Sequence, residues 1–236
     1  MTTFSLTSFN TRWGLTIEDE PFDLAEVVGG FGTDLVCLQE VWEPTDGGSG
    51  LDAAADRLGY HLVHVPLSPS RVIPRPEITA DPAAAEGTWG VALLSRLPIR
   101  ATRIVDLGRA VERWDVADRY AILAEAAVGD VTATVTALHL SFAMPNALAQ
   151  LRRLRGYLPT HRPSIVAGDC NLWGPLATAT LGDHRRAVRG RTWPADRPHS
   201  QLDHVLVSPA IEVVGAAVLP PAGSDHRPVQ VELRVR

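Results

Sequence analysis

Short apolar runs separated by polar turns recur along the whole chain, and several alternate apolar and polar residues as half-buried β-strands do. The runs are FSLTSF (4–9), DLVCLQ (34–39), YHLVHVPL (60–67), GVALLS (90–95), AILAEAAV (121–128), VTATVTALHLS (131–141), SIVAG (164–168), LDHVLVS (202–208) and VQVELRV (229–235). Helical candidates are fewer, namely 23–28, 50–58 and 146–158. The last has leucines at spacings of three and four, and Asn146 is its expected N-cap. This pattern predicts a strand-rich α/β protein.

No linker and no internal repeat interrupts the pattern, so we predict a single domain over residues 1–236. A chain of this length can bury a substantial core. Residues 68–88 are rich in Pro and Ala and differ from the strand pattern around them. Two interpretations of this segment remain open, a long loop or lid and a disordered surface segment.

The composition is ordinary for a globular protein, with 45% hydrophobic and 21% charged residues. No apolar run has membrane-spanning length, and MTTFSLTSFN lacks the regions of a signal peptide, so we expect no membrane anchor. The two cysteines, Cys37 and Cys170, cannot form a disulfide framework, which favours a reducing cytoplasm. We expect a cytoplasmic monomer.

The charge of the chain narrows the classes of function. A formal net charge of −5 argues against a generic nucleic-acid coat. All 22 basic residues are Arg, so catalysis through a lysine Schiff base or a Walker lysine is excluded.

Polar side chains stand at or near the ends of several predicted strands. The run SIVAG leads into Asp169 and Asn171, which would project side by side because residues two apart on a strand share a face. Two interpretations fit this pair alone: a polar turn bonded to its own backbone, and a site for a metal ion or an attacking water. Other strand ends carry Asn10, Glu40, His139, Asp203 and Ser224-Asp225-His226. Their repetition favours a functional site.

These residues lie in blocks that resemble a known family. In chain order the blocks are SFNTRWG, DLVCLQEVW, GVALLSRLPI, ALHLS, IVAGDCNLWG, QLDHVLVS and SDHRPVQVEL. From residue 4 to the C-terminus, the chain resembles the endonuclease/exonuclease/phosphatase superfamily of DNase I-like proteins. Gly-Asp-x-Asn alone is a weak signal, but Leu-Asp and Ser-Asp-His-Arg-Pro-Val after it make a strong one. The resemblance implies a four-layer α/β sandwich, in which helices flank two packed, mostly antiparallel β-sheets, and metal-dependent hydrolysis of a phosphate ester.

The resemblance also implies a metal site. Glu40 is the first choice for a carboxylate ligand of Mg²⁺ (or Mn²⁺), with Asn10 beside it and Asp225 as an additional carboxylate. The abasic-site branch of the family usually has an acidic residue two positions after the first Asn, where this chain has Arg12. This departure argues against an assignment to DNA repair. Arg12 is either a contact for substrate phosphate or a surface residue.

Five residues receive catalytic roles from the same resemblance. His226 and Asp203 resemble the family's His–Asp pair, in which the carboxylate orients the imidazole for proton transfer or phosphate binding. We expect these two side chains to form a hydrogen bond. Asp169 would orient or deprotonate the attacking water, Asn171 would hold a phosphoryl oxygen, and His139 would donate to the phosphate.

The identity of the substrate is the part of the function that the sequence determines least. Arg185 and Arg186 precede Trp193 in a loop-like stretch, and Arg forks suit phosphate, so both are candidate substrate-binding residues and nucleic acid is a possible partner. The predicted protein is an Mg/Mn-dependent phosphodiesterase or nuclease acting on a phosphoester substrate. Alternatives are a phosphomonoesterase or lipid-headgroup phosphodiesterase on the same site, and a non-catalytic binding module of this fold. The complete set of acidic and His residues argues against the last.

Overall fold

In the computed structural model, the described residues are 2–47, 50–71, 78–79, 81–109, 115 and 117–236. The strands of one sheet are β1 (Thr3–Asn10), β2 (Leu35–Pro44), β3 (His61–Ser70), β4 (Gly87–Ser95), β11 (Ile211–Val218) and β12 (Val229–Val235). Those of the other are β5 (Ile99–Arg109), β6 (Asp118–Val128), β7 (Val131–His139), β8 (Ser164–Asp169), β9 (Arg185–Arg186) and β10 (Asp203–Val207). The first sheet has the order β11-β12-β1-β2-β4-β3 and the second β5-β6-β7-β8-β10-β9.

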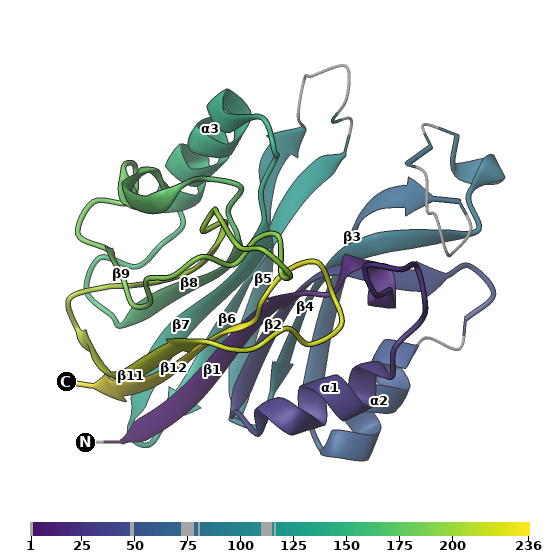
Figure 1. The fold of residues 1–236 in the computed structure, drawn as a ribbon. Coiled ribbons are helices and arrows are strands. Elements are labelled where there is room, and N and C mark those ends of the chain that lie inside the picture. Colours follow the sequence, from purple (N-terminus) through teal and green to yellow (C-terminus); the bar gives the residue numbers. More distant parts are fainter. Residues whose placement is uncertain (1, 48–49, 72–77, 80, 110–114, 116) are drawn as a thin grey trace.

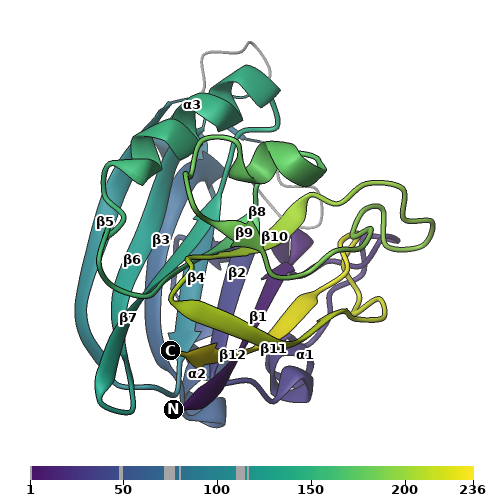
Figure 2. The ribbon, with the colours of Figure 1, turned by 90° about the vertical axis from the view of Figure 1, so that its left-hand side faces the viewer.

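Helices cover the outer faces of the two sheets (Figures 1 and 2). They are α1 (Leu24–Phe31), α2 (Gly50–Leu58) and α3 (Met144–Arg155), with short 3-10 turns η1 (Arg12–Gly14), η2 (Pro82–Ala84) and η3 (Gly174–Thr178). Apolar residues of α1 and α2 pack with Phe9 and Leu38 of the first sheet. Those of α3 pack with Leu138 and Val166 of the second. The predicted four-layer α/β sandwich is therefore confirmed.

Each sheet contains one parallel pair of strands, β1 with β2 and β7 with β8. The other described pairings are antiparallel, as predicted. Parallel neighbours end at the same edge of a sheet, so residues at their carboxyl ends lie close together. These are the ends that carry the predicted site residues.

The large apolar core lies between the sheets, and the candidate site lies at one end of this core. Ala137 of β7 and Ala167 of β8 face this core. Side chains alternate along a strand, so His139 and Asp169, two residues further on, face the same side. Asp169 is aligned with His139 on one neighbouring strand and with Asp203 on the other. One level of the second sheet therefore carries three of the predicted residues.

All nine predicted strands are present, and the described residues contain three further strands that were not predicted. Most residues of β5 are exposed, and its alternation of buried and exposed positions is limited to Val105-Asp106-Leu107. β11 forms an edge of its sheet, and a bulge between Val213 and Gly215 shifts its register. β9 has only two residues. These three strands lie at sheet edges and show little of the apolar pattern by which the other strands, including the edge strand β3, are recognised.

The helix over 146–158 begins earlier than predicted. The N-cap of α3 is Ala143, and Pro145 lies in the first turn, where its missing N–H would have no intrahelical partner. Asn146 is thus inside the helix, and its prediction as a cap is wrong. None of the helices in the described part of the chain has the length and hydropathy needed to cross a bilayer.

The ends of the Pro- and Ala-rich segment 68–88 belong to strands, because β3 extends to Ser70 and β4 starts at Gly87. Ile78 forms an isolated bridge with Ser70. Residues 72–77 and 80 of this segment lie outside the described residues.

Candidate active site

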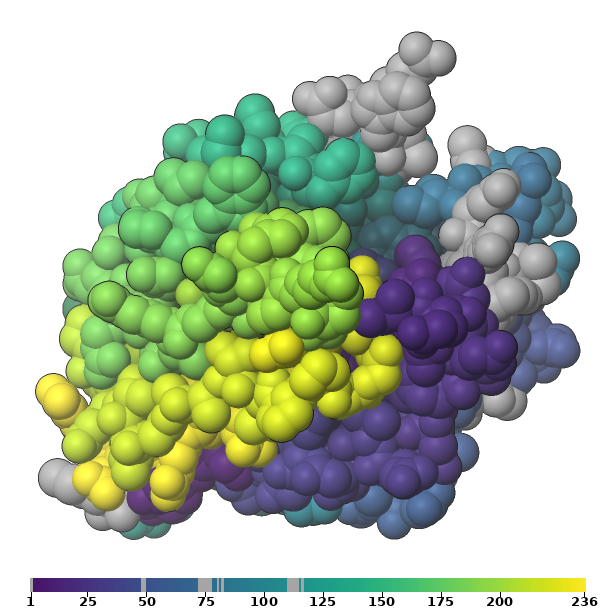
Figure 3. Space-filling view, in the orientation of Figure 1, coloured from purple at the N-terminus to yellow at the C-terminus, as the bar shows by residue number. Residues whose placement is uncertain are grey.

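Residues from both sheets meet at one end of the inter-sheet core. The Asn10 amide Nδ2 donates to Glu40 Oε1 at 3.0 Å and to Asp169 Oδ2 at 3.1 Å. Asn10 and Glu40 belong to the first sheet and Asp169 to the second, so this amide joins the two sheets. In Figure 3 the purple N-terminal segment meets green and yellow C-terminal segments around a hollow on one face.

Glu40 is directed toward the other site residues by an irregularity of β2. The register of β2 against β4 shifts between Gln39 and Val41, and Glu40 has a φ of 52°. Such bulges re-aim a side chain, and a left-handed backbone costs a non-Gly residue on the order of 1–3 kcal/mol. Burial, together with the charges of Asp225 and Asp169, raises the pKa of Glu40 to about 7, although the Asn10 hydrogen bond and the charge of His226 oppose the shift.

The Gly-Asp-x-Asn block forms a sharp turn at the end of β8. A Cβ at Gly168 would lie 2.0 Å from the Leu138 carbonyl oxygen, so only glycine fits there. Asp169 Oδ1 accepts a hydrogen bond of 2.9 Å from the Asn171 N–H, and Asn171 has a φ of 50°. The predicted strand geometry of this pair is therefore wrong beyond Asp169. The polar turn of the first interpretation is present, and it leaves both side chains in the lining of one cavity.

His139 has a neutral amide as its nearest polar partner. Asn171 Nδ2 donates to the Leu140 carbonyl at 3.0 Å, which fixes the amide, and lies 3.3 Å from His139 Nε2. Nε2 also lies 3.6 Å from Asp169 Oδ2. Burial, with the charges of Arg119 and His226, lowers the pKa of His139 to about 3, although Asp169 opposes the shift. The predicted donation to phosphate through Nε2 requires the tautomer in which Nε2 carries the proton.

The predicted hydrogen bond between His226 and Asp203 is present, at 2.9 Å from Nδ1 to Oδ2. The other ring nitrogen, Nε2, lies 3.8 Å from Asp169 Oδ2. Burial alone would lower the pKa of His226, but the charge and hydrogen bond of Asp203, with the charges of Asp169 and Asp225, raise it to about 10. His226 is therefore a cation near neutral pH, in contrast to His139.

Asp225 lies beside this pair. Its Oδ2 accepts a 3.2 Å hydrogen bond from Trp193 Nε1, and its charge acts on both Glu40 and His226. The carboxylate therefore adds negative charge to the region where the metal site was predicted.

The donor set fits a hard divalent cation. Ligand atoms of Asp169, Asp203 and His226 all lie within 4.8 Å of one another, but a protonated imidazole does not bind a metal ion, which leaves the two carboxylates of this group. Asp203 is buried, and its Oδ1 has no hydrogen-bond partner among the described residues. Glu40, linked to Asp169 through Asn10, keeps about 19% of its side chain exposed. Carboxylate oxygens are the ligands that Mg²⁺ and Mn²⁺ prefer.

The site opens into a cavity of about 400 Å³. Its polar lining consists of Glu40, His139, Asp169, Asn171, His226 and the pair Asp115 and Arg119. Its apolar lining consists of Trp13, Ile78, Trp89, Phe142, Trp193 and Leu202. The reacting groups therefore face a space with largely aromatic walls.

Sequence reasoning missed a buried ion pair in this cavity. Arg119 Nη2 contacts both oxygens of Asp115 at 3.0 and 3.1 Å, and the side chains are only 3% and 1% exposed. Nη1 donates to the His139 carbonyl at 3.4 Å, and the guanidinium lies 5.1 Å from the ring centre of Trp89. In the sequence, a charged residue just before an apolar strand is indistinguishable from a surface residue.

The structure does not bring Arg12 into the cavity lining. Its Nη2 forms an ion pair with Asp19 at 2.8 Å, and its Nη1 donates to the Thr16 carbonyl. Arg12 thus stabilises the loop that follows β1.

Arg185 and Arg186 also lie away from the cavity lining. β9 pairs with Leu206 and Val207, at the opposite end of β10 from Asp203. Arg185 donates to the Ile211 carbonyl at 2.8 Å, and Arg186 to Gln201 Oε1 at 3.3 Å. Their predicted contact with substrate would have to occur outside the cavity.

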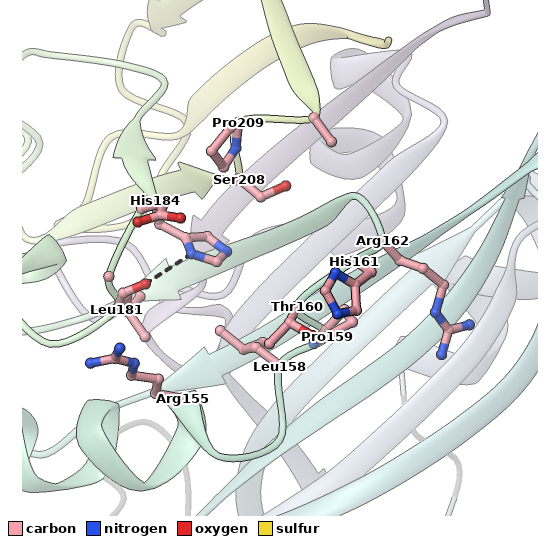
Figure 4. A pocket seen from close by; sticks show the side chains of 13 residues that line it. Arg155, Leu158, Pro159, Thr160, His161, Arg162, Leu181, His184, Ser208 and Pro209 are labelled. Carbon is pink, nitrogen blue, oxygen red and sulfur yellow. Dashed lines mark hydrogen bonds between the residues drawn. The ribbon is translucent and has the colours of Figure 1, made fainter.

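A second cavity, of about 380 Å³, lies beyond the end of α3 and contains two Arg and two His residues (Figure 4). Arg162 forms an ion pair with Glu125 at 3.0 Å, and His184 Nδ1 donates to the Leu181 carbonyl at 3.1 Å. The predicted catalytic and metal-site residues are absent from its described lining. The candidate chemistry is therefore confined to the first cavity.

The fold is an α/β sandwich whose two sheets meet at a cluster of carboxylates, amides and imidazoles. The chain belongs to the endonuclease/exonuclease/phosphatase family, whose family model matches residues 7–226. The uncharacterized protein YbhP of Escherichia coli (strain K12) is 27% identical over 270 residues, covering 98% of this chain and 96% of YbhP.

Solved structures share the fold. An endonuclease/exonuclease/phosphatase from Beutenbergia cavernae has a TM-score of 0.80 at 21% identity, covering 100% of this chain and 72% of that one. A mannosyl-6-phosphatase from Bacteroides thetaiotaomicron has a TM-score of 0.75 at 16% identity, covering 98% and 99% of the two chains. At these identities the likeness extends to the fold alone.

Proposed function

We propose that this protein is a divalent metal-dependent hydrolase that cleaves a phosphodiester. The observation that carries the proposal is the His226–Asp203 hydrogen bond of 2.9 Å, which directs the second imidazole nitrogen toward Asp169. A fixed cation beside a carboxylate suits a reaction in which water attacks a phosphorus atom.

The chain's own residues divide the work. Asp169 orients the attacking water and accepts its proton. His226 holds a phosphoryl oxygen or protonates the leaving oxygen through Nε2, because Asp203 keeps Nδ1 protonated. Asn171 Nδ2 supplies a further donor next to the neutral His139.

Glu40 would hold the metal ion, with Asn10 beside it and Asp225 adding negative charge. A bound Mg²⁺ or Mn²⁺ supplies charge neutralisation at the phosphoryl oxygens. Because the pKa of Glu40 is raised to about 7, its carboxyl must lose a proton before it can bind the ion at lower pH.

The charge of the cavity favours a diester over a monoester. Of the described residues that line it, Arg119 and His226 carry positive charge, and Arg119 is already paired with Asp115. A phosphodiester carries one negative charge, whereas a phosphomonoester carries nearly two at neutral pH. Because His226 is likewise paired, with Asp203, neither cation of this lining is free to balance the second charge of a monoester, and the diester is the better match.

The test compares bis(4-nitrophenyl) phosphate with 4-nitrophenyl phosphate, each with Mg²⁺, with Mn²⁺ and with EDTA. We expect the diester to be cleaved faster and EDTA to abolish cleavage. Glu40→Gln should weaken the dependence on metal concentration, whereas His161→Gln, in the exposed lining of the second cavity, should not. Full activity in EDTA would contradict metal dependence, and faster cleavage of the monoester would favour a phosphomonoesterase.

A further inference from the structure

Trp13 stands between two hollow spaces. It lines the catalytic cavity of about 400 Å³ and also a groove of about 530 Å³. The groove is bordered by α1, α2 and the end of β2. A side chain that borders both spaces forms part of the wall that separates them.

The groove is apolar inside and charged at its edge. Phe22, Leu24, Trp42 and Leu51 are among its lining residues. At its edge Arg57 and Asp23 form an exposed ion pair of 3.4 Å. An apolar group of a substrate that extended past Trp13 would therefore pack against apolar side chains.

The backbone at Trp13 is held in an unfavourable conformation. Arg12 and Trp13 have consecutive φ values of 45° and 59°, which are rare for residues other than glycine. The ion pair of Arg12 with Asp19 stabilises this loop from one side. From the other side, Thr11 Oγ1 donates to the Glu40 carbonyl at 2.9 Å. Strain of this kind persists where surrounding contacts enforce it and clusters at functional sites.

We propose that Trp13 is a specificity-determining residue that limits the size of the substrate's non-leaving ester group. The inference rests on the proposed phosphodiesterase function. The wild-type cavity accepts a compact apolar ester group between its aromatic walls, and the indole blocks the passage into the groove. Shortening Trp13 joins the two spaces, so a bulky ester group gains room while a compact one gains nothing.

The experiment uses two substrates with the same 4-nitrophenolate leaving group, methyl 4-nitrophenyl phosphate and 1-naphthyl 4-nitrophenyl phosphate. We expect Trp13→Ala to raise the naphthyl-to-methyl ratio of kcat/KM by about tenfold or more, the size of effect typical of an apolar pocket. The gain should come mainly from a lower KM for the naphthyl ester. Trp13→Leu should give a smaller increase of the same sign.

Trp173→Ala is the matched control. Trp173 is also an indole near the site motif, but it is 68% exposed and lines neither space, so the ratio should not change. If Trp13→Ala does not fold, as judged by circular dichroism, Trp13→Leu and Trp13→Phe decide the question.

An unchanged naphthyl-to-methyl ratio in the folded Trp13 variants would overturn the inference. If kcat/KM falls equally for both esters, the role of Trp13 is purely structural. In either case wild-type cleavage of the methyl ester leaves the proposed function standing. If the wild type cleaves neither ester with Mg²⁺ or Mn²⁺, the proposed function fails and this inference fails with it.

Discussion

The two histidines of the cavity have opposite surroundings. Burial, with the charges of Arg119 and His226, lowers the pKa of His139 to about 3. His226 is also buried, but its bond to Asp203 and the nearby carboxylates raise its pKa to about 10. Similar burial thus gives a neutral imidazole in one corner and a cation in the other. Neighbouring groups with separated pKa values are the usual basis for dividing acid and base roles.

The strongest test of this difference is to replace each histidine by glutamine. His226→Gln should lower kcat on the diester by a factor on the order of 10²–10⁴, because the amide cannot carry the proton that general acid catalysis requires. His139→Gln can still accept a hydrogen bond from Asn171, so we expect a loss below about tenfold. Steady-state kinetics of the Mn²⁺-loaded variants measure both. Equal losses would show that the two corners have the same role.

Asp203→Asn tests the origin of the cation. We expect a loss of kcat similar to that of His226→Gln, because the imidazole loses the carboxylate that keeps Nδ1 protonated. The double variant should be no slower than either single variant, because residues that act as a unit are not additive. Additive losses would mean that Asp203 acts independently of His226.

The pH dependence of stability separates the two corners in the metal-free protein. The pKa of His226 rises on folding from 6.5 to about 10, so its stabilisation is complete below pH 6.5 and is lost as the pH rises toward 10. The pKa of His139 falls on folding from 6.5 to about 3, so its burial increasingly destabilises the fold as the pH falls from 6.5 toward 3. Each effect is on the order of a few kcal/mol at most.

Urea unfolding between pH 4 and 10 in EDTA measures these slopes. His226→Gln should flatten the loss of stability above pH 6.5, and His139→Gln the loss on the acid side. Glu40, whose pKa rises on folding from 4.5 to about 7, lowers stability as the pH rises through a window that overlaps that of His139, so the effect of His139 is the difference between the slopes of the wild type and His139→Gln. A wild-type alkaline slope that survives in His226→Gln would place the titrating group elsewhere.

Much of the fold was predictable because interior strands show a regular apolar pattern, whereas the edge strands β5 and β11 expose too much of their surface to show one. The site residues were found through their motif blocks. The bulge that aims Glu40 was not predictable, because it follows from the pairing of β2 with β4. Trp13 and Arg119 were missed for a related reason: in sequence an aromatic residue resembles core and an Arg resembles surface.

The protonation difference also lay beyond the sequence. His139 is the last residue of β7 and His226 lies shortly before β12, each in a recognised block, and nothing local in the sequence distinguishes their pKa values. Both imidazoles are buried near Asp169; the distinction arises because Asp203 forms a hydrogen bond with His226, whereas the charges of Arg119 and His226 act on His139. Contacts between distant segments therefore decide which imidazole carries the charge.

The smallest expected effect on activity is that of removing the cations outside the cavity. It tests whether local contacts alone cause the difference in pKa between the two histidines. Arg185 and Arg186 are bonded to Ile211 and Gln201, and their charges do not contribute to the shifts of His139 or His226. Replacing both by Ala should leave kcat and its pH profile within about twofold, a difference below about 0.5 kcal/mol.

The same double variant tests the predicted nucleic-acid contact. Each Arg that neutralises a phosphate contributes about 0.7 to the slope of log K against log salt for single strands, so an unchanged slope for an oligonucleotide is the expected result. Arg152→Ala with Arg153→Ala removes the same charge from exposed positions of α3 and is the matched control. A slope reduced by about 1.4 in the Arg185 and Arg186 variant but not in the control would show two phosphate contacts on β9. Substrate recognition would then extend well beyond the cavity, and a nuclease would become the better description of the enzyme.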